Sequence, residues 1–360
     1  MMNRIFCTAL ILFAFPALAD HESAESILGQ VRQYAPRTYK LQPAQRVREL
    51  PVSQTHDTQR LKAELETLSK GVFGVVMLES GAIVSENYAN GADASAPVNL
   101  YSATKSLTAL AVGEALCAGK IKSLDDLASV YVPALIGTAY GAASIRNLLG
   151  YTSGAKDPGG TGYSGIHNSG DFSSMMRQEI GLIDLMKKHG DHSQYRQGDK
   201  FIYNGLDSES LSLVVRGATG MPLPQWFEST VWQKAGGEYP AAWFTDNDGN
   251  GIGEALVWIT TRDFLRIGLY TLERLTGKSS DSCMNTFVNE AAQPRTAKGY
   301  WLSAPYWGLG LHIGADKNIW FFGHGAQRVG INQKTGRIVA MNGFSEWKNM
   351  DMDIQRLFNR

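Results

Sequence analysis

The chain has 360 residues, of which 44% are hydrophobic and 19% are charged. This is the composition of a globular protein with ample apolar material for one large domain or two closely packed ones. Lysines plus arginines equal aspartates plus glutamates at 34 each, so the charge balance gives no reason to expect nucleic acid or an anionic membrane as partner. We therefore expect a small-molecule substrate held in a pocket, and the composition leaves the oligomeric state open.

Residues 1–19 have the features of a secretory signal peptide. Arg4 precedes an apolar run over residues 5–15, and Ala17-Leu18-Ala19 before Asp20 matches an A-x-A cleavage site. The apolar run is shorter than the roughly 18 to 20 residues that a membrane span needs. The sequence therefore predicts export, a mature chain that begins at Asp20, a periplasmic location and no stable membrane span after cleavage.

The mature chain would hold two cysteines, Cys117 and Cys283. They lie far apart in the sequence and both have helix-like surroundings, where buried free thiols are common. We expect free thiols, with a single disulfide as the alternative in an oxidising compartment. The sequence has no C-x-x-C or zinc-finger spacing, and we expect neither a cofactor nor a metal.

The mature chain is predicted to begin with an irregular segment. Residues 20–57 are polar and aperiodic and contain several prolines, which predicts an extended N-terminal segment on the surface. Residues 58–68 have leucines at helical spacing, which predicts a short helix. We expect one domain to extend from residue 58 to residue 360.

A hairpin and a helix are predicted next. Two apolar runs rich in β-branched residues, 73–78 and 83–88, flank Glu79-Ser80-Gly81-Ala82 and predict a β-hairpin. After a polar loop, residues 102–118 carry apolar side chains at helical spacing, and a glycine follows. This pattern predicts a mostly buried helix with Ser102 at its beginning.

The second half of the chain is predicted to return to the sheet. Residues 120–254 show short helical patterns without the alternation of strands, so we predict a mostly helical insertion. Helices are predicted over 261–275 and 350–358. Three runs between them predict strands of an antiparallel sheet: 307–313, 319–322 and 338–342. The expected fold class is α/β (α+β), an antiparallel sheet flanked by helices on both faces with a helical inserted region.

The sharpest chemical signal is Ser102-Ala103-Thr104-Lys105, an S-x-x-K motif at the start of a predicted helix. A spacing of three places both side chains on one helical face. A serine hydroxyl is a poor nucleophile until a base removes its proton, and burial can lower the pKa of a lysine enough for that task. Alone, the motif also fits an ordinary helix start with the serine as cap and the lysine in solvent.

Four later segments resemble motifs of the serine β-lactamase and penicillin-binding protein superfamily, in the same order. Residues 144–154 resemble T-I-R-x-L-L-x-H-T-S-G, and residues 198–205 resemble G-x-x-F-x-Y-S-N, which supplies a tyrosine facing the nucleophile. Residues 260–268 are similar to the S-T-x-R-D-L-A-R-F-G helix. Residues 322–330 are similar to G-H-T-G-G-x-x-G, the strand that replaces lysine-threonine-glycine in the esterase and peptidase branches. The resemblance implies the β-lactamase/transpeptidase-like fold.

The resemblance also implies roles for the matching residues. Ser102 would be the acyl-accepting nucleophile, Lys105 its activating base, and Tyr203 a proton relay. The oxyanion would be held by the N–H of Ser102 and by that of Ala326 or Gln327. The candidates for oxyanion or substrate binding are Asn204, His324, Gly325, Ala326 and Gln327.

Two departures separate the chain from the β-lactamases. Those enzymes have tyrosine, any residue, asparagine, whereas this chain has Tyr203-Asn204-Gly205, so the asparagine that would hold a lactam side-chain amide is missing or displaced by one position. The third motif begins with His324 instead of lysine, and Ala326 replaces its glycine. The resemblance therefore points towards the esterases and the 6-aminohexanoate-dimer hydrolases of the superfamily.

We expect an exported serine hydrolase that cleaves an ester, amide or peptide bond through an acyl-enzyme. Two alternatives stay open. One is a β-lactamase or D,D-peptidase acting on cell-wall peptides, and the other is a non-catalytic ligand-binding protein of the same fold.

Three further patterns have ordinary interpretations. Lys334-Thr335-Gly336 joins two predicted strands and is interpreted as a hairpin turn, because His324 already occupies the third-motif position. Residues 246–251 copy the first half of a calcium loop, but the glutamate expected at the twelfth position is absent, which favours a plain glycine-rich loop. His189 and His192 lack the carboxylate signature of a metalloprotease and are predicted to be solvent-exposed.

Overall fold

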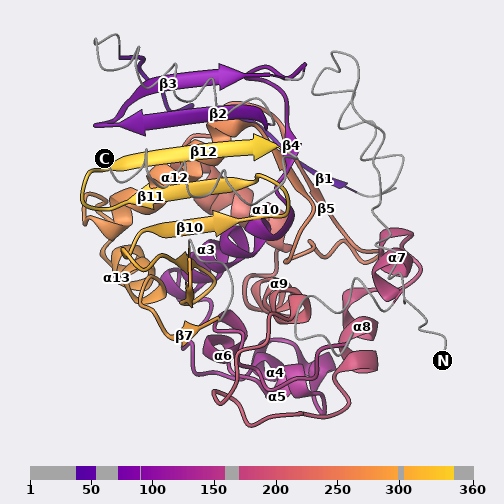
Figure 1. Cartoon of the computed structure of the whole chain (residues 1–360). Helices are drawn as coiled ribbons and strands as arrows, with labels where there is room; N and C mark the ends of the chain where they lie inside the picture. Colours follow the sequence, from indigo (N-terminus) through magenta and orange to yellow (C-terminus); the bar gives the residue numbers. More distant parts are fainter. Residues whose placement is uncertain (1–37, 54–71, 90, 159–169, 299–303, 344–360) are drawn as a thin grey trace, which may run out of the picture.

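The computed structural model describes residues 38–53, 72–89, 91–158, 170–298 and 304–343. Within these ranges it contains an eight-stranded sheet with the order β3-β2-β12-β11-β10-β9-β8-β7 and a four-stranded sheet with the order β1-β5-β6-β4 (Figure 1). All the strand pairs are antiparallel, and helices pack against them, which confirms the predicted fold class. The predicted signal peptide and the helices predicted over 58–68 and 350–358 lie outside the described residues.

The large sheet pairs an early hairpin with the last strand of the described chain. β2 (Val72–Glu79) and β3 (Ala82–Tyr88) form the predicted hairpin, and Ser80 and Gly81 at its turn have φ angles of 51° and 83°. Two central residues with positive φ are typical of a type I′ turn, whose twist matches that of the strands. The remaining strands, in spatial order from β2, are β12 (Arg337–Gly343), β11 (Arg328–Asn332), β10 (Ile319–Phe322), β9 (His312–Ile313), β8 (Tyr306–Trp307) and β7 (Thr296–Ala297).

One predicted turn between these strands is confirmed, and one predicted strand contains a turn instead. Lys334-Thr335-Gly336 forms the predicted hairpin turn between β11 and β12, where the side chain of Asn332 accepts the N–H groups of Lys334 and Thr335. The single strand predicted over 307–313 is wrong, because β8 and β9 are separate strands joined by a tight turn. Gly310 in that turn has a φ of 77°, and an added Cβ would lie 2.3 Å from the Cβ of Ala109. Gly310 therefore lets the turn pack closely against the helix that carries Ala109.

The small sheet corrects two expectations. It consists of β1 (Thr38–Leu41), β5 (Ala241–Phe244), β6 (Val257–Ile259) and β4 (Val98–Asn99). β1 belongs to the segment predicted as an irregular surface lead-in, and β5 to the insertion predicted to lack strands. All four residues of β5 are buried. A strand buried on both faces shows no alternation of polar and apolar residues, so its sequence pattern did not reveal it.

Helix α3 (Thr104–Cys117) runs through the centre of the molecule, and every residue from Thr104 to Ala115 is buried. Half of its residues are alanine, serine, threonine or glycine, whose small size lets neighbouring elements approach closely. At Gly113 an added Cβ would lie 2.4 Å from the ring of Phe287 in α13 (Ser282–Ala291). Helix α12 (Thr261–Leu275), predicted with these bounds, packs on β2, β11 and β12.

The region between the two parts of the sheet is mostly helical, as predicted, and its helices α4, α5, α6 and α8 lie in the lower part of the view in Figure 1. Its α-helices are α4 (Ala128–Tyr131), α5 (Ala139–Ala142), α6 (Ile145–Leu149), α7 (Asp171–Met176), α8 (Leu182–His189), α9 (Gly205–Thr219), α10 (Leu223–Phe227) and α11 (Gln233–Ala235). Its described residues also include the 3₁₀ turn η3 (Pro133–Leu135) and the π-helical turn η5 (Glu228–Trp232). Across the described ranges, we find no helix with the length and apolar character that crossing a membrane requires.

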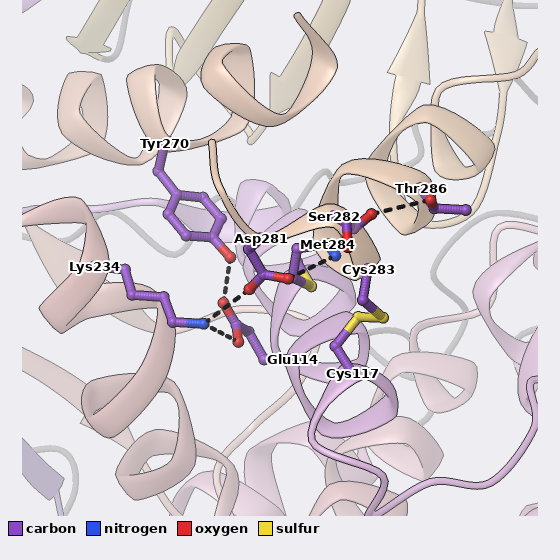
Figure 2. Close-up of a disulfide and its surroundings, with 9 residues drawn as sticks. All are labelled: Glu114, Cys117, Lys234, Tyr270, Asp281, Ser282, Cys283, Met284 and Thr286. Carbon is purple, nitrogen blue, oxygen red and sulfur yellow. Dashed lines mark hydrogen bonds and ion pairs between the residues drawn. A yellow bond between two sulfur atoms is a disulfide. The ribbon is translucent and has the colours of Figure 1, made fainter. Parts of the chain in front are cut away.

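A disulfide ties α3 to α13. Cys117 at the end of α3 and Cys283 at the start of α13 are bonded, so the expectation of free thiols is wrong (Figure 2). The two helices pack against each other, which brings the Cα atoms to 5.6 Å across a sequence separation of 166. Figure 2 also shows Glu114, one turn before Cys117, bound to Lys234 and to the hydroxyl of Tyr270. These contacts fix the carboxyl end of α3.

Removing this disulfide should destabilise the protein without moving its catalytic groups. We expect the Cys117→Ser/Cys283→Ser variant to lose about 2–5 kcal/mol of unfolding free energy, because the bond closes a long loop in the unfolded chain. Urea unfolding of the variant and of the wild type with and without reductant measures this loss. Equal midpoints for all three samples would contradict the prediction.

Candidate active site

Ser102 lies in a short 3₁₀ turn, η2 (Tyr101–Ala103), directly before α3. Tyr101 has a φ of 46°, a left-handed conformation that costs a non-glycine residue on the order of 1–3 kcal/mol. The surroundings hold it there, because the Tyr101 N–H donates to the side chain of Asn99 and the Leu100 N–H donates to the carbonyl of Val257 in β6. The small sheet therefore positions the nucleophile, which is itself half-buried.

The predicted pair of Ser102 and Lys105 is brought together by the structure. Nζ of Lys105 lies 3.0 Å from Oγ of Ser102, and the Lys105 side chain is buried. Nζ also donates to the main-chain oxygen of Glu254 at 2.9 Å and lies 3.3 Å from its Oε2. Only 1% of each of the Lys105 and Glu254 side chains is exposed. The sequence analysis missed Glu254, because it lies 149 residues from Lys105 in a loop with no periodic pattern.

Tyr203 completes the predicted trio. Nζ of Lys105 lies 5.1 Å from the centroid of the Tyr203 ring, and the tyrosine is fully buried. Burial raises the pKa of the Tyr203 hydroxyl, interaction with the Ser102 hydroxyl lowers it, and the charge of Glu254 raises it. Burial and the charge of Glu254 thus keep the phenol in its protonated form.

An aromatic cluster holds Tyr203 in place. Tyr151 stacks on Trp307 with ring centroids 4.7 Å apart, and the Tyr203 ring lies edge-on to both. The Tyr151 hydroxyl lies 2.6 Å from Oγ of Ser208 in α9. The segment 144–154 thus acts as a support that packs against the Tyr203 loop.

The turn that carries the third motif lies beside the nucleophile. An added Cβ at Gly323 would lie 1.9 Å from the carbonyl oxygen of Leu100, so only glycine permits this approach. His324 is exposed, and its ring lies edge-on to Tyr101 with centroids 5.6 Å apart. Gly325, next in the turn, is buried and has a φ of 72°. The turn and the residue before Ser102 therefore form one contiguous site.

Hydrogen bonds in the same turn distinguish the main-chain N–H groups of Ala326 and Gln327 as possible oxyanion donors. The N–H of Ala326 donates to the carbonyl of Gly343 at 3.0 Å, so strand pairing already uses it. The Gln327 side chain binds the main-chain N–H and carbonyl of Gly343, and no part of this side chain is exposed. Of the two predicted donors, the main-chain N–H of Gln327 is therefore the better candidate.

Asn204 has hydrogen-bond partners inside the protein. Its side-chain oxygen accepts the N–H of Leu206 and caps α9, and its amide donates to the hydroxyl of Tyr140 at 3.0 Å. The side chain is buried and both its polar atoms make internal bonds, so the structure gives Asn204 a capping role, and the substrate contact stays a prediction. At Gly205 an added Cβ would lie 1.8 Å from Oε2 of Glu254. The glycine of Tyr203-Asn204-Gly205 thus makes room for a buried carboxylate.

Glu254 is itself held by its neighbours. The carboxylate of Glu209 in α9 accepts the N–H of Gly253 at 2.7 Å and that of Glu254 at 3.2 Å. Burial raises the pKa of Glu209 strongly and the charge of Glu254 adds to this, while the two N–H groups act in the opposite direction. Leu256 has a φ of 66°, so the loop after Glu254 is strained. The hydrogen bonds from Glu209 and the unusual backbone conformation at Leu256 together fix the loop, and with it the direction of the Glu254 side chain.

Lys298 and His312 form a pair of buried basic side chains next to the aromatic cluster. Nζ of Lys298 lies 2.7 Å from Nδ1 of His312, and both residues are buried. The His312 ring is 4.6 Å from that of Trp307 and 6.4 Å from that of Tyr203. Burial lowers the pKa of Lys298 to about 7. The pKa of His312 is lowered by burial and then by the charge of Lys298.

The remaining candidates have structural places. The carboxylate of Asp246 accepts the N–H groups of Asp248 and Asn250, which closes the glycine-rich loop. His189 is half-buried against Asp171 at 2.7 Å, so its predicted exposure is wrong, whereas His192 is exposed. Within the described part of the chain, no group of three or more histidine, cysteine, aspartate or glutamate side chains is arranged to hold a metal ion.

Comparison with known proteins gives one family match. The sequence model of the Beta-lactamase family matches residues 61–356, which is more than half of the chain. No curated protein matches the chain in sequence at a significant level.

Solved structures share the fold at low sequence identity. The chain is 18% identical to "Putative 6-aminohexanoate-dimer hydrolase from Bacillus anthracis", with a TM-score of 0.74 over 91% of this chain and 90% of that one. It is 18% identical to a penicillin-binding protein from Bacillus halodurans, with a TM-score of 0.64 over 83% and 99%. It is 17% identical to EstCE1, a hydrolase with promiscuous acyltransferase activity, with a TM-score of 0.63 over 80% and 94%. At such identities the likeness concerns the fold.

Lys298 should make stability depend on pH. Its folded pKa of about 7 lies below the ordinary 10.5, so between these values the unfolded chain binds a proton that the folded chain lacks, and stability rises with pH. We expect Lys298→Met to raise the melting temperature relative to wild type more at about pH 6.5 than at about pH 10. The exposed Lys120→Met is the matched control. A difference that is independent of pH would contradict the prediction.

Proposed function

The chain belongs to the Beta-lactamase family, and from this premise we propose that it is an exported serine hydrolase that cleaves an ester or amide bond through an acyl-enzyme on Ser102. One observation carries the proposal. The buried amine of Lys105 lies 3.0 Å from the half-buried hydroxyl of Ser102. A nucleophile at the surface of a site, with its base shielded from water behind it, is the arrangement that acyl transfer needs.

The acylation step follows from the neighbouring groups. Ser102 Oγ attacks the substrate carbonyl carbon, and Lys105 accepts the hydroxyl proton directly or through Tyr203. The oxyanion is bound by the N–H of Ser102 and by that of Gln327. As the tetrahedral intermediate collapses, the bond to the leaving group breaks and Tyr203 delivers the proton to that group. Water then attacks the acyl-enzyme, and the acid is released with Ser102 restored.

The local chemistry favours ordinary esters or amides over lactams. Glycine occupies position 205, where the β-lactamases have the asparagine that holds a lactam side-chain amide, and His324 replaces the lysine of the third motif. The structural neighbours include a 6-aminohexanoate-dimer hydrolase and a hydrolase with promiscuous acyltransferase activity alongside a penicillin-binding protein, so their names are compatible with this direction. Turnover of a chromogenic cephalosporin, or release of D-alanine from a model peptide, would instead favour the β-lactamase or D,D-peptidase alternative.

Export to the periplasm is part of the proposal. The sequence over residues 1–19 supports it, and so does the disulfide between Cys117 and Cys283, because such bonds persist in oxidising compartments. N-terminal sequencing of the protein recovered from the periplasm would test the predicted start at Asp20.

The proposed roles are tested by hydrolysis of p-nitrophenyl butyrate. We expect Ser102→Ala to abolish turnover with the fold intact, because it removes the atom that forms the acyl-enzyme. Lys105→Ala and Tyr203→Phe should each lower kcat/KM by at least about 10²-fold. Circular dichroism of each variant checks the fold.

Two outcomes would count against the proposal. Full activity in Ser102→Ala would exclude the serine mechanism. A wild type that turns over no ester, amide, peptide or lactam, and gives no acyl-enzyme by mass spectrometry, would favour the non-catalytic binding protein.

A further inference from the structure

We infer that Glu254 is a positioning residue for Lys105. Its carboxylate occupies the space beside the lysine that is open because residue 205 is a glycine. The inference rests on the proposed function, since it deepens the role of the Ser102–Lys105 pair. Within the contacts described above, Glu254 is the acidic side chain that touches the Lys105 amine.

The contacts around Nζ of Lys105 carry the argument. The amine that accepts the Ser102 proton must be neutral, with two N–H donors and one lone pair. Three oxygen atoms lie within hydrogen-bond distance of Nζ, Oγ of Ser102 at 3.0 Å, the Glu254 carbonyl at 2.9 Å and Oε2 of Glu254 at 3.3 Å. One residue therefore supplies two of the three contacts, and they leave Ser102 as the third. The amine is aimed at the nucleophile because Glu254 holds its other two positions.

Gly205 is the matching half of this arrangement. An added Cβ at position 205 would lie 1.8 Å from Oε2 and 2.4 Å from the carboxyl carbon of Glu254. Any side chain there would push the carboxylate away from Lys105. Glycine in the tyrosine motif and an acid at position 254 are thus complementary, because the absence of a side chain at position 205 leaves room for the carboxylate.

The carboxylate can also take up charge during catalysis. When Lys105 accepts the Ser102 proton, the serine oxygen forms its bond to the carbonyl carbon and the lysine becomes an ammonium ion beside the Glu254 carboxylate. A charge that forms next to a fixed opposite charge is stabilised. Glu254 therefore acts through Lys105 and touches neither substrate nor leaving group.

The test is the pH dependence of kcat for p-nitrophenyl butyrate in Glu254→Gln. The amide keeps the size of the side chain and removes its charge, which disfavours the ammonium form of Lys105. We expect the acidic limb of the kcat profile to move to lower pH by about one unit, and kcat at the optimum to fall about tenfold with KM within about twofold. An acidic limb that stays in place or moves to higher pH would overturn the inference.

Other titratable groups near Glu254 also contribute to the pH dependence of kcat. The titratable side chains around Glu254 are Lys105 from α3, Glu209 from α9, and the buried phenols of Tyr203, Tyr151 and Tyr140. Glu114→Gln is the matched control, because Glu114 is a buried acid on α3 that binds Lys234 and Tyr270 instead of the site. This control should lose stability and leave the acidic limb in place.

A second measurement does not depend on turnover. Lys105→Met and Glu254→Gln should each lower the urea midpoint, because each leaves a buried partner uncompensated, and the double variant should lose less than the sum of the two losses. Additive losses would overturn the inference. If this coupling is present while the wild type hydrolyses none of the substrates tested, the proposed function fails and the Lys105–Glu254 contact stands.

Discussion

Burial of the Lys105 amine is the constraint to which the rest of the site conforms. A buried amine must find its hydrogen-bond partners inside the protein, because water is excluded from it. Those partners come from separate parts of the chain, since Ser102 precedes α3 and Glu254 lies in the loop between β5 and β6. The small sheet fixes the residue before Ser102, and Glu209 in α9 fixes the backbone at Glu254. Sheet, central helix and helical insertion therefore all contribute to a single contact.

The sequence predicted those features that local chemistry determines. The S-x-x-K spacing requires only one helical turn, so Ser102 and Lys105 could be paired without knowledge of the fold. The bounds of α12 and the hairpin turn at Lys334-Thr335-Gly336 follow equally from nearby residues, through apolar periodicity in one case and turn chemistry in the other. Tyr203 was found through a motif whose order along the chain carried the information.

Features that depend on contacts between distant segments were missed or misassigned. Cys117 and Cys283 meet only because α3 and α13 pack together, and no pattern around either cysteine encodes that packing. Asn204 resembled a substrate contact in sequence, yet the start of α9 required a cap and the Tyr140 hydroxyl a partner. Glu254 stands in a loop without periodicity. Its role can be recognised only once the fold brings Lys105 and Gly205 next to it.

The tight fit between Gly205 and Glu254 bears on how the protein could change over time. An asparagine at position 205 would collide with the carboxylate, whose Oε2 would lie 1.8 Å from the new Cβ. An evolutionary route towards the β-lactamase form of the tyrosine motif would therefore have to displace the Glu254 carboxylate from its place beside Lys105. A smaller residue at position 254 would make that room, and Lys105 would keep the main-chain oxygen of residue 254 and the Ser102 hydroxyl as partners until the asparagine arrived. Substitutions at the two positions are thus coupled through the space that both side chains need beside the buried amine.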